Sequence, residues 1–187
     1  MLCRLSSTIL NKSDIARALE VSEGSIRQFL TIVEGTFVCR SLPSYEKAIT
    51  KTIIKMPKGY LRDSGLLHAL LKITHESSLY LDPIVGHSFE GFVIEEIIKG
   101  LQSTWLTHWT PYYYRTRAGA EIDLILEGPF GVLPIEIKYG SHTDPRNLKN
   151  LEAFIVDHHL EFGLLINQSE HARWISRSVF QLPVNYL

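Results

Sequence analysis

The chain has 187 residues, a formal net charge of −1 at pH 7 and a hydrophobic fraction of 45%. This length fits one domain of ordinary size or two small ones, and the composition argues against a disordered chain. The nearly neutral charge excludes a uniformly positive surface, so any contact with nucleic acid has to come from a local patch.

The cysteine content and the hydropathy pattern bear on the cellular compartment. Cys3 and Cys39 are the two cysteines of the sequence, and neither belongs to a metal-ligand spacing. This pattern argues against a disulfide framework or a structural zinc site, and it favours a reducing, cytoplasmic location. No apolar run approaches the roughly 18 residues of a membrane helix, so we expect no membrane contact.

Residues 1–50 read as a small helical module. Ser13 is predicted to cap a first helix, and a turn over residues 21–25 leads into a second helix with apolar Ile26, Phe29, Leu30 and Val33. A β-prone segment over residues 36–40 follows. Two short helices and a β segment indicate a winged-helix-like module. The alternative is a plain αα-hairpin.

The second predicted helix is a weak candidate for reading DNA. It carries Arg27 and Gln28, but also Glu23 and Glu34, and acidic groups disfavour contact with phosphates. Packing against a partner domain is the alternative role. A basic run follows the module, and a solvated face explains it more simply than a phosphate-steering patch does; its members are Lys47, Lys51, Lys55, Lys58 and Arg62.

A strong amphipathic helix is predicted after Gly86. Its apolar stripe consists of Phe89, Phe92, Val93, Ile97, Ile98 and Leu101. Glu90 lies three, four and seven residues before apolar positions, so it falls on or beside the buried face. Glu95 and Glu96 are expected on the solvated face. A carboxylate at position 90 is therefore paired or directed at a charged group.

Two neighbouring β-prone runs carry the most informative charges of the chain. The first, residues 121–126, contains Asp123, and the second, residues 135–138, contains Glu136 and Lys138. If the turn between them is centred between Pro129 and Phe130, paired residue numbers sum to about 259 and Asp123 lies directly across from Glu136. Lys138 then follows Glu136 on the same face of the strand.

This arrangement has a chemical and a structural explanation. Two adjacent carboxylates repel each other unless a cation lies between them, and Mg²⁺ is held by one or two carboxylates together with water and phosphate oxygens. A bound Mg²⁺ or Mn²⁺ activates water for phosphodiester hydrolysis, and a nearby lysine offsets phosphoryl charge. Glu90 could add a third acidic group. The structural alternative is a solvent-facing, salt-bridged pair of strands.

The remaining residues complete an α/β (α+β) pattern. Residues 162–167 are predicted to form a buried strand of a mixed or parallel sheet, and residues 179–182 a last strand. Residues 145–158 form an amphipathic helix, whose inward residues are Leu148, Leu151, Phe154 and Ile155. We expect two domains, a winged-helix-like module over residues 1–50 and a mixed sheet flanked by helices over residues 51–187.

Several segments together resemble a known family. The chain is similar to the C-terminal region of bacterial and archaeal proteins in which an AAA-type P-loop ATPase module precedes a domain of unknown function. The similar segments are residues 10–16, 21–22, 55–66, 86–93, 114–115, 119–123 and 135–138. No Gly-x-x-x-x-Gly-Lys-Ser/Thr motif occurs in the sequence, so the ATPase module itself is absent from it.

The resemblance implies a PD-(D/E)XK nuclease-like fold for the C-terminal part. It implies metal ligands at Asp123 and Glu136, a catalytic lysine at Lys138 and an accessory helix acid at Glu90. Two functions remain open. One is a Mg²⁺- or Mn²⁺-dependent nuclease acting on DNA. The other is a non-catalytic module that binds DNA or a protein and is regulated by an attached ATPase. A preserved fold without activity is a third reading.

Overall fold

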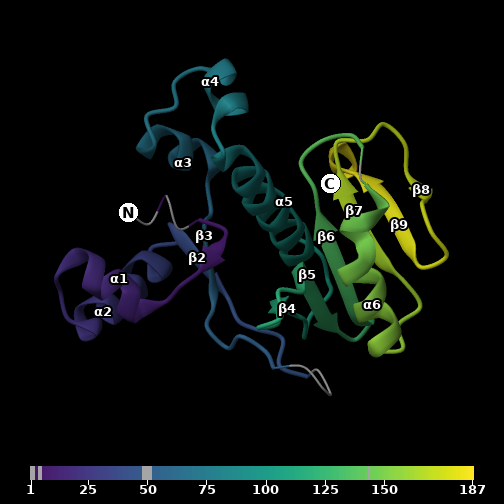
Figure 1. The fold of residues 1–187 in the computed structure, drawn as a ribbon, viewed down its shortest axis with the longest axis horizontal. Helices are drawn as coiled ribbons and strands as arrows, with labels where there is room; N and C mark the ends of the chain where they lie inside the picture. The colour runs from purple at the N-terminus through teal and green to yellow at the C-terminus, as the bar shows by residue number, and fades with distance from the viewer. Residues whose placement is uncertain (1–2, 4–5, 48–51, 143) are drawn as a thin grey trace. The chain divides into compact units, whose positions relative to one another are not determined.

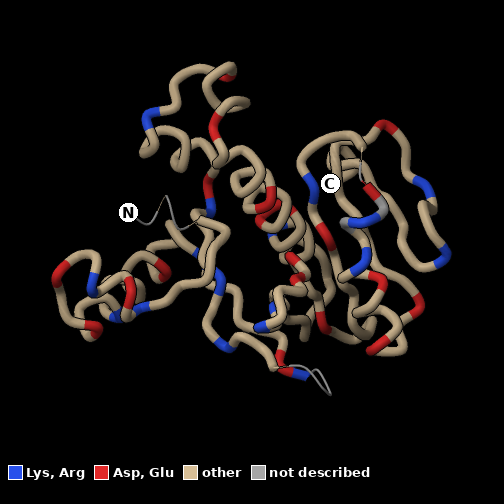
Figure 2. Tube along the Cα trace, viewed as in Figure 1, with Lys and Arg blue, Asp and Glu red and all other residues tan. Residues whose placement is uncertain are grey.

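The computed structural model describes the chain except residues 1–2, 4–5, 48–51 and 143 (Figure 1). Lys51 of the predicted basic run lies outside the described residues. The chain forms two compact units, and each draws on two stretches of sequence: Met1–Leu42 with Met56–Phe92 (unit 1), and Pro43–Lys55 with Val93–Leu187 (unit 2). Acidic and basic residues are interspersed along both units (Figure 2).

Unit 1 begins with the two predicted helices, α1 (Lys12–Leu19) and α2 (Glu23–Gly35). The prediction that Ser13 caps α1 was wrong. Asn11 is the N-cap, because its side chain accepts hydrogen bonds from the backbone N–H groups of Ser13 and Asp14. Ile15, Ile26 and Leu30 are buried in one cluster that joins the two helices.

A three-stranded antiparallel sheet follows in unit 1. Its order is β1 (Thr8–Ile9), β3 (Lys58–Leu61) and β2 (Cys39–Leu42). Gly59 of β3 lies so close to Leu10 that a Cβ atom there would come within 2.7 Å of the leucine side chain. Two short helices complete the unit, α3 (Ser64–Leu70) and α4 (Glu76–Leu81).

Helix α5 (Ile84–Gln102) belongs to both units: residues up to Phe92 count with unit 1 and those from Val93 with unit 2. The expectation that Glu95 is solvated was wrong, because its residue is only 1% exposed. Glu96 does lie at the surface, where it pairs with Lys99. The apolar stripe of α5 is therefore interrupted by a buried carboxyl group that its helical spacing does not indicate.

Unit 2 is built on a six-stranded sheet in the order β4-β5-β6-β7-β9-β8. The strands β4, β5 and β6 are antiparallel, whereas β6, β7 and β9 run parallel, so the sheet is mixed and the predicted α/β class is confirmed. The bounds are β4 (Thr110–Arg115), β5 (Glu121–Gly128), β6 (Gly131–Ile137), β7 (Gly163–Asn167), β8 (Arg173–Trp174) and β9 (Val179–Pro183).

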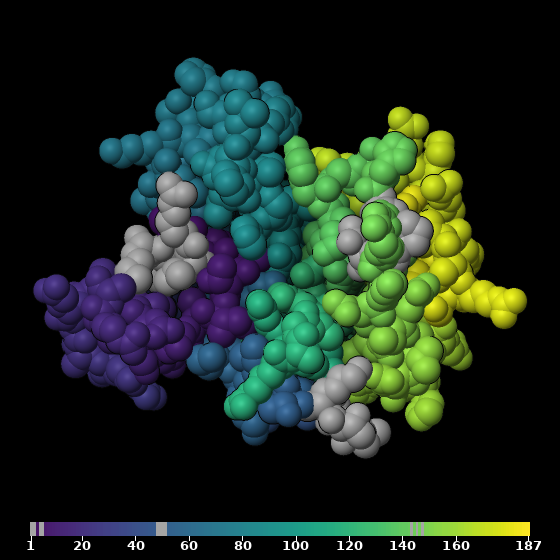
Figure 3. Space-filling model, in the orientation of Figure 1, coloured from purple at the N-terminus to yellow at the C-terminus, as the bar shows by residue number. Residues whose placement is uncertain are grey.

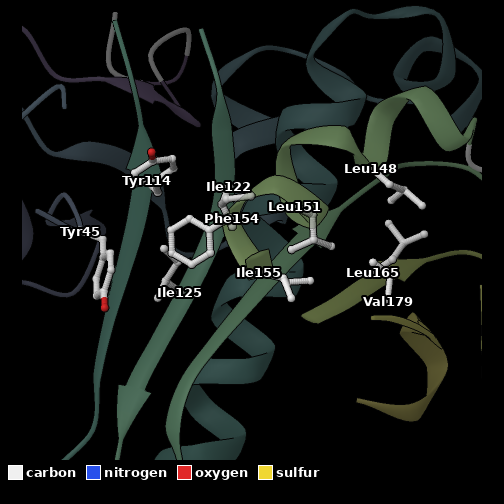
Figure 4. Packing of buried hydrophobic residues seen from close by; sticks show 10 residues of the cluster. All are labelled: Tyr45, Tyr114, Ile122, Ile125, Leu148, Leu151, Phe154, Ile155, Leu165 and Val179. Atoms are coloured by element: carbon white, nitrogen blue, oxygen red, sulfur yellow. The ribbon is translucent and has the colours of Figure 1, made fainter. Parts of the chain in front are cut away.

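One face of this sheet packs against α6 (Lys149–Asp157), which follows the 3-10 turn η2 (Pro145–Leu148) (Figure 1). The predicted inward residues of this helical segment are all buried. Figure 4 shows them meeting side chains of β4, β5, β7 and β9; the shared cluster contains Tyr45, Tyr114, Ile122, Ile125, Leu148, Leu151, Phe154, Ile155, Leu165 and Val179. This cluster is the core of unit 2 on the α6 face.

The compact units and the expected domains describe different properties. The expected domains are divided by position in the sequence, between residues 50 and 51. The compact units are groups of residues in contact, and unit 1 contains β3 and α3 together with α1 and α2. The domain division therefore stays a prediction. Within the described residues, no helix is both long and apolar enough to cross a membrane.

Candidate metal and phosphodiester site

The site begins with the hairpin of β5 and β6, whose predicted register is confirmed. Gly128 pairs with Gly131 and Leu124 pairs with Ile135, so the paired numbers sum to 259 as expected. The turn consists of Pro129 and Phe130, between the two strands. The alternation of side chains along β6 then carries Glu136 and Lys138 to one face.

A β-bulge in β5 lies between Ile122 and Ile125, the segment that contains Asp123. The pairing of β4 with β5 shifts by one residue between Tyr112 and Tyr114. As a result, Ile122 and Ile125 both reach the α6-side core although they are three residues apart, which a regular strand does not permit. Bulges frequently redirect a side chain next to a functional site, and this one changes the orientation of the segment that contains Asp123.

Asp123 takes over a backbone contact at the end of the hairpin ladder. The pairing of β5 and β6 stops at Leu124 and Ile135, so the backbone pair predicted between Asp123 and Glu136 is not formed. Instead, Oδ2 of Asp123 accepts a hydrogen bond of 2.8 Å from the backbone N–H of Ile137. This contact holds the carboxylate beside the peptide that links Glu136 and Ile137.

Glu136 and Lys138 form an ion pair along β6. Nζ of Lys138 lies 2.6 Å from Oε1 of Glu136, and the Lys138 side chain is 35% exposed. Asp123 and Glu136 are both buried, with 7% and 5% of their surfaces exposed. The structure therefore places Asp123 beside the peptide that links Glu136 and Ile137, and it pairs Glu136 with the partly exposed ammonium group of Lys138.

The burial of the two carboxylates decides against one alternative. A solvent-facing, salt-bridged pair of strands would leave both acidic side chains in water, where ion pairs contribute little. Here both lie in the interior, where an ionised carboxylate is costly unless it is paired, hydrogen-bonded or bound to a cation. The structure thus supplies partners for each: the Ile137 N–H for Asp123 and the Lys138 ammonium for Glu136.

Glu90 lies in unit 1 and has a different set of contacts. Its Oε1 accepts hydrogen bonds of 2.7 Å from Nζ of Lys58 and from the hydroxyl of Tyr60, and its Oε2 accepts one from the Ser7 hydroxyl. The side chain of Lys58 is only 3% exposed. The expectation that Lys58 lies on a solvated face was therefore wrong. Glu90 connects α5 to the small sheet of unit 1.

Two further cations of the predicted basic run form ion pairs at the surface. Lys47 lies 2.6 Å from Glu127, and Lys55 lies 2.9 Å from Glu46. Each of these cations therefore has an acidic partner within unit 2.

The donor set fits a divalent cation in part. Two carboxylates match the one or two by which Mg²⁺ is held, with water and phosphate oxygens as the further ligands. Across the described part of the chain, no three His, Cys, Asp or Glu side chains gather as a group that could hold a metal ion. A cation at Asp123 and Glu136 would therefore rely on two protein ligands.

Two buried amides on the same sheet were missed at the level of sequence. Asn167 of β7 is fully buried, and its Nδ2 lies 3.3 Å from Oε1 of Gln181 of β9. Both residues interrupt apolar strands, as Asp123 and Glu136 do. The same reasoning about polar groups within strand cores could have identified them.

The comparisons with known proteins match two separate parts of the chain to families. Residues 1–77 match a family described as a domain of unknown function, DUF8612. Two mycobacterial relatives, the uncharacterized protein Mb2031c of Mycobacterium bovis and the uncharacterized protein Rv2008c of Mycobacterium tuberculosis, are each 32% identical over 190 residues. These matches cover 100% of this chain and 41% of each relative, so the chain spans about two fifths of their length.

No solved structure matches the chain. The C-terminal match is the more extensive of the two family matches: residues 85–187, which contain α5, the six-stranded sheet and the Asp123–Glu136–Lys138 site, fit a second family model over more than half of the chain. The chain belongs to this family, described as a domain of unknown function, DUF4143.

Proposed function

We propose that unit 2 is a metal-dependent nuclease-like domain of the PD-(D/E)XK type that hydrolyses phosphodiester bonds in DNA. Two contacts at the end of the β5–β6 ladder support this proposal: Asp123 accepts a hydrogen bond from the peptide next to Glu136, and Glu136 forms an ion pair with Lys138. In this proposal the chain corresponds to the C-terminal part of a longer protein with an AAA-type ATPase module. The first 50 residues form its winged-helix-like module.

Each residue has a distinct task in the proposed reaction. Asp123 and Glu136 would hold Mg²⁺ or Mn²⁺, which lowers the pKa of a bound water and stabilises charge on the phosphodiester. Lys138, the more exposed member of the site, would contact the phosphate and offset the negative charge that develops on it. The Ile137 N–H keeps the Asp123 carboxylate in place. Glu90 would act only as an accessory acid.

The test is cleavage of supercoiled plasmid and of a branched DNA junction with Mg²⁺ or Mn²⁺. We expect Asp123→Ala and Lys138→Ala to lower the rate at least about 100-fold, the loss typical of a removed charge-stabilising group. Lys149→Ala serves as the matched control, because Lys149 is an exposed lysine at the start of α6. Cleavage that survives both site substitutions would come from a contaminant and would refute the assignment.

A specific observation favours a second candidate, a non-catalytic module that binds a protein partner. Exposed apolar side chains lie on α2 and next to the turn before it: Phe29 and Ile32 are 47% and 55% exposed, and Leu19 and Val21 lie nearby in sequence with similar exposure. The Arg27 guanidinium lies 3.6 Å from the Glu23 carboxylate, so its charge is already partnered. This face suits an apolar protein contact better than DNA phosphates.

This candidate makes different predictions for the same protein. It expects no metal-dependent cleavage and intact binding of DNA or a partner in Glu136→Ala. It also expects Arg27→Ala to leave DNA affinity unchanged within about twofold, since an exposed ion pair contributes little. Titration of Mg²⁺ or Mn²⁺ into the protein by calorimetry separates the two candidates: binding that is lost in Asp123→Asn supports the nuclease.

A further inference from the structure

A pocket of about 450 Å³ opens in unit 2 away from Asp123. Four parts of the chain border it: the loop after β6, α6 with the preceding turn, β8 and β9. In Figure 3, the yellow-green atoms belong to the α6 segment, and the yellow atoms at the right belong to the last strands of unit 2. The lining residues used below are Leu148, Glu152, Arg173, Ile175 and Gln181.

The pocket shares a face of the sheet with Glu136. Glu136 pairs with Leu165 across β6 and β7, and Leu165 pairs with Gln181 across β7 and β9. Gln181 in turn pairs with Arg173 of β8. Directly paired residues point to the same face and adjacent strands are about 4.8 Å apart, so Gln181 and Arg173 stand about 10 and 14 Å from Glu136 along one row.

The floor of the pocket is held by buried hydrogen bonds. Gln181 is 5% exposed; its Oε1 accepts a hydrogen bond from Asn167, and its Nε2 donates one of 3.2 Å to the carbonyl of His171. The loop after β6 is fixed as well, because the carbonyl of Gly140 accepts a hydrogen bond of 3.0 Å from the N–H of Gln168. The pocket is thus preformed by the sheet and its loops.

The chemistry of the lining combines apolar and charged groups. Leu148 and Ile175 supply apolar surface, while Arg173 supplies a cation and Glu152 an acceptor. Within the described residues, neither of these charged side chains forms an ion pair. The volume falls in the range of about 300–1,000 Å³ that is usual for small-ligand sites. A nucleotide has this combination of properties: flat apolar base faces, hydrogen-bonding edges and a phosphate for an arginine.

We propose that this pocket binds an unpaired nucleotide of the DNA strand that is cut at Asp123, Glu136 and Lys138. This inference rests on the proposed function. Leu165 lies between Glu136 and Gln181 in this row and is fully buried under α6, so a DNA strand has to pass around the row and not along it. Phosphates recur about every 3.4 Å along a stacked strand, so the span of about 14 Å sets a minimum of roughly four nucleotides between the cut and the pocket. The pocket therefore favours substrates with a single-stranded segment on one side of the cut.

The first test measures binding without catalysis. A 5′-fluorescein-labelled single-stranded DNA of twelve nucleotides is titrated by fluorescence anisotropy in EDTA at one fixed salt concentration. We expect Arg173→Ala to raise Kd at least about fivefold. Arg177→Ala is the matched control, because Arg177 is an exposed arginine of the same β8–β9 connection outside the pocket, and we expect a change of less than about twofold.

Equal weakening by the two arginine substitutions would overturn the pocket assignment, since it would reflect charge alone. Undetectable binding of the oligonucleotide by the unsubstituted chain would overturn it as well. Thermal melting of each variant, followed by circular dichroism, verifies that the sheet is intact. If Arg173→Ala is found to unfold, Glu152→Gln is measured in its place. We expect Glu152→Gln to change Kd at least about threefold, and Glu161→Gln is its control.

The second test compares cleavage of a blunt duplex with cleavage of duplexes that carry four-nucleotide 5′ or 3′ overhangs, in Mg²⁺. We expect the ratio of overhang to blunt cleavage to fall in Arg173→Ala and to stay unchanged in Arg177→Ala. Cleavage with an unchanged ratio in Arg173→Ala overturns the pocket and leaves the proposed function intact. Absence of cleavage together with Arg173-dependent oligonucleotide binding refutes the nuclease and retains the nucleotide site.

Discussion

The carboxylate of Asp123 accepts a hydrogen bond from the backbone N–H of Ile137, so a side chain occupies the place of a strand carbonyl at the end of the β5–β6 ladder. This contact gives Asp123 a structural task beside its proposed role toward a metal. The two tasks can be separated, because an asparagine keeps a carbonyl oxygen for the N–H but loses the negative charge.

We therefore predict different outcomes for two substitutions of Asp123. Asp123→Ala leaves the buried N–H of Ile137 without its acceptor and should lower the free energy of unfolding by about 1–3 kcal/mol. Asp123→Asn should cost less than about 1 kcal/mol. Urea unfolding followed by circular dichroism measures both values, and calorimetric titration of Mn²⁺ measures the metal affinity.

The metal affinity should depend on the charge at position 123 and not on the hydrogen bond to Ile137. Both variants should lose at least about tenfold in Mn²⁺ affinity if the charge of Asp123 is a ligand, because a divalent ion favours a charged carboxylate oxygen. Retention of wild-type affinity in Asp123→Asn would show that this carboxylate serves the fold alone.

Glu90 gives a second prediction, which concerns stability. Its carboxylate is ion-paired with Lys58, whose side chain is almost fully buried in unit 1. Glu90→Gln removes one partner of a buried pair and should lower the free energy of unfolding by about 3–5 kcal/mol. The double variant Glu90→Gln with Lys58→Met should recover part of this loss, because no buried cation then remains at position 58.

Glu96→Gln is the control for Glu90, since it removes a carboxylate from an exposed pair on the same helix. We expect it to change stability by no more than about 0.5 kcal/mol. A Glu90→Gln protein as stable as wild type would contradict the predicted structural role of this carboxylate, and a reduced metal affinity in the same variant would support its proposed role as an accessory acid.

The third prediction concerns two glycines, at which alanine should have opposite effects on stability. A Cβ atom at Gly163 of β7 would lie 2.9 Å from the Leu151 side chain and 3.0 Å from the carbonyl oxygen of Pro134. Gly163→Ala should therefore destabilise the protein by about 1–3 kcal/mol through overpacking against α6 and β6. At Gly100 of α5, nothing lies within 4 Å of an added Cβ.

Gly100→Ala should stabilise the protein by about 0.5–1 kcal/mol, because alanine reduces the entropy that a helical glycine loses on folding. Thermal melting of the two variants side by side checks the pair. If Gly163→Ala melts at or above the wild-type temperature, the packing of α6 on the sheet is looser than the structure indicates.

Sequence reasoning recovered the elements of the fold where apolar periodicity is strong. The hairpin register and the inward residues of α6 followed from alternation, turn chemistry and helical spacing. The bulge at Asp123 did not, because it depends on how β4 pairs with β5, which lies outside any local window. The site residues could therefore be named, but not the backbone contact that fixes the first carboxylate.

Two of the errors, those for Glu95 and Lys58, share one physical cause. Glu95 and Lys58 were expected in water because charged residues are rarely buried, yet tertiary contacts bury both. For Lys58 the partner, Glu90, lies 32 residues away. Helical and strand periodicity describe one element at a time, so they cannot detect a charge that another element covers.

Tyr45 provides the pH-dependent prediction. Its ring is buried against Tyr112 and Phe154 in the unit 2 core, and burial raises the pKa of the phenol, with the nearby Glu127 carboxylate raising it further. A phenol whose pKa is raised in the folded state binds its proton more tightly there than in the unfolded chain. Its contribution to stability is complete below the unfolded pKa of about 10 and is lost as pH rises through the folded pKa.

We therefore expect the free energy of unfolding to fall above pH 10, and to fall less in Tyr45→Phe, which has no phenol to ionise. Urea unfolding at pH 8 and at about pH 11 measures both slopes, with Tyr186→Phe as the control because Tyr186 is an exposed tyrosine near the C-terminus. Parallel pH dependence in the wild type and Tyr45→Phe would show that Tyr45 ionises equally well in both states. It would then follow that water or the neighbouring Lys47 ammonium stabilises the phenolate, since only solvation or a neighbouring cation lets a buried phenolate form without loss of stability.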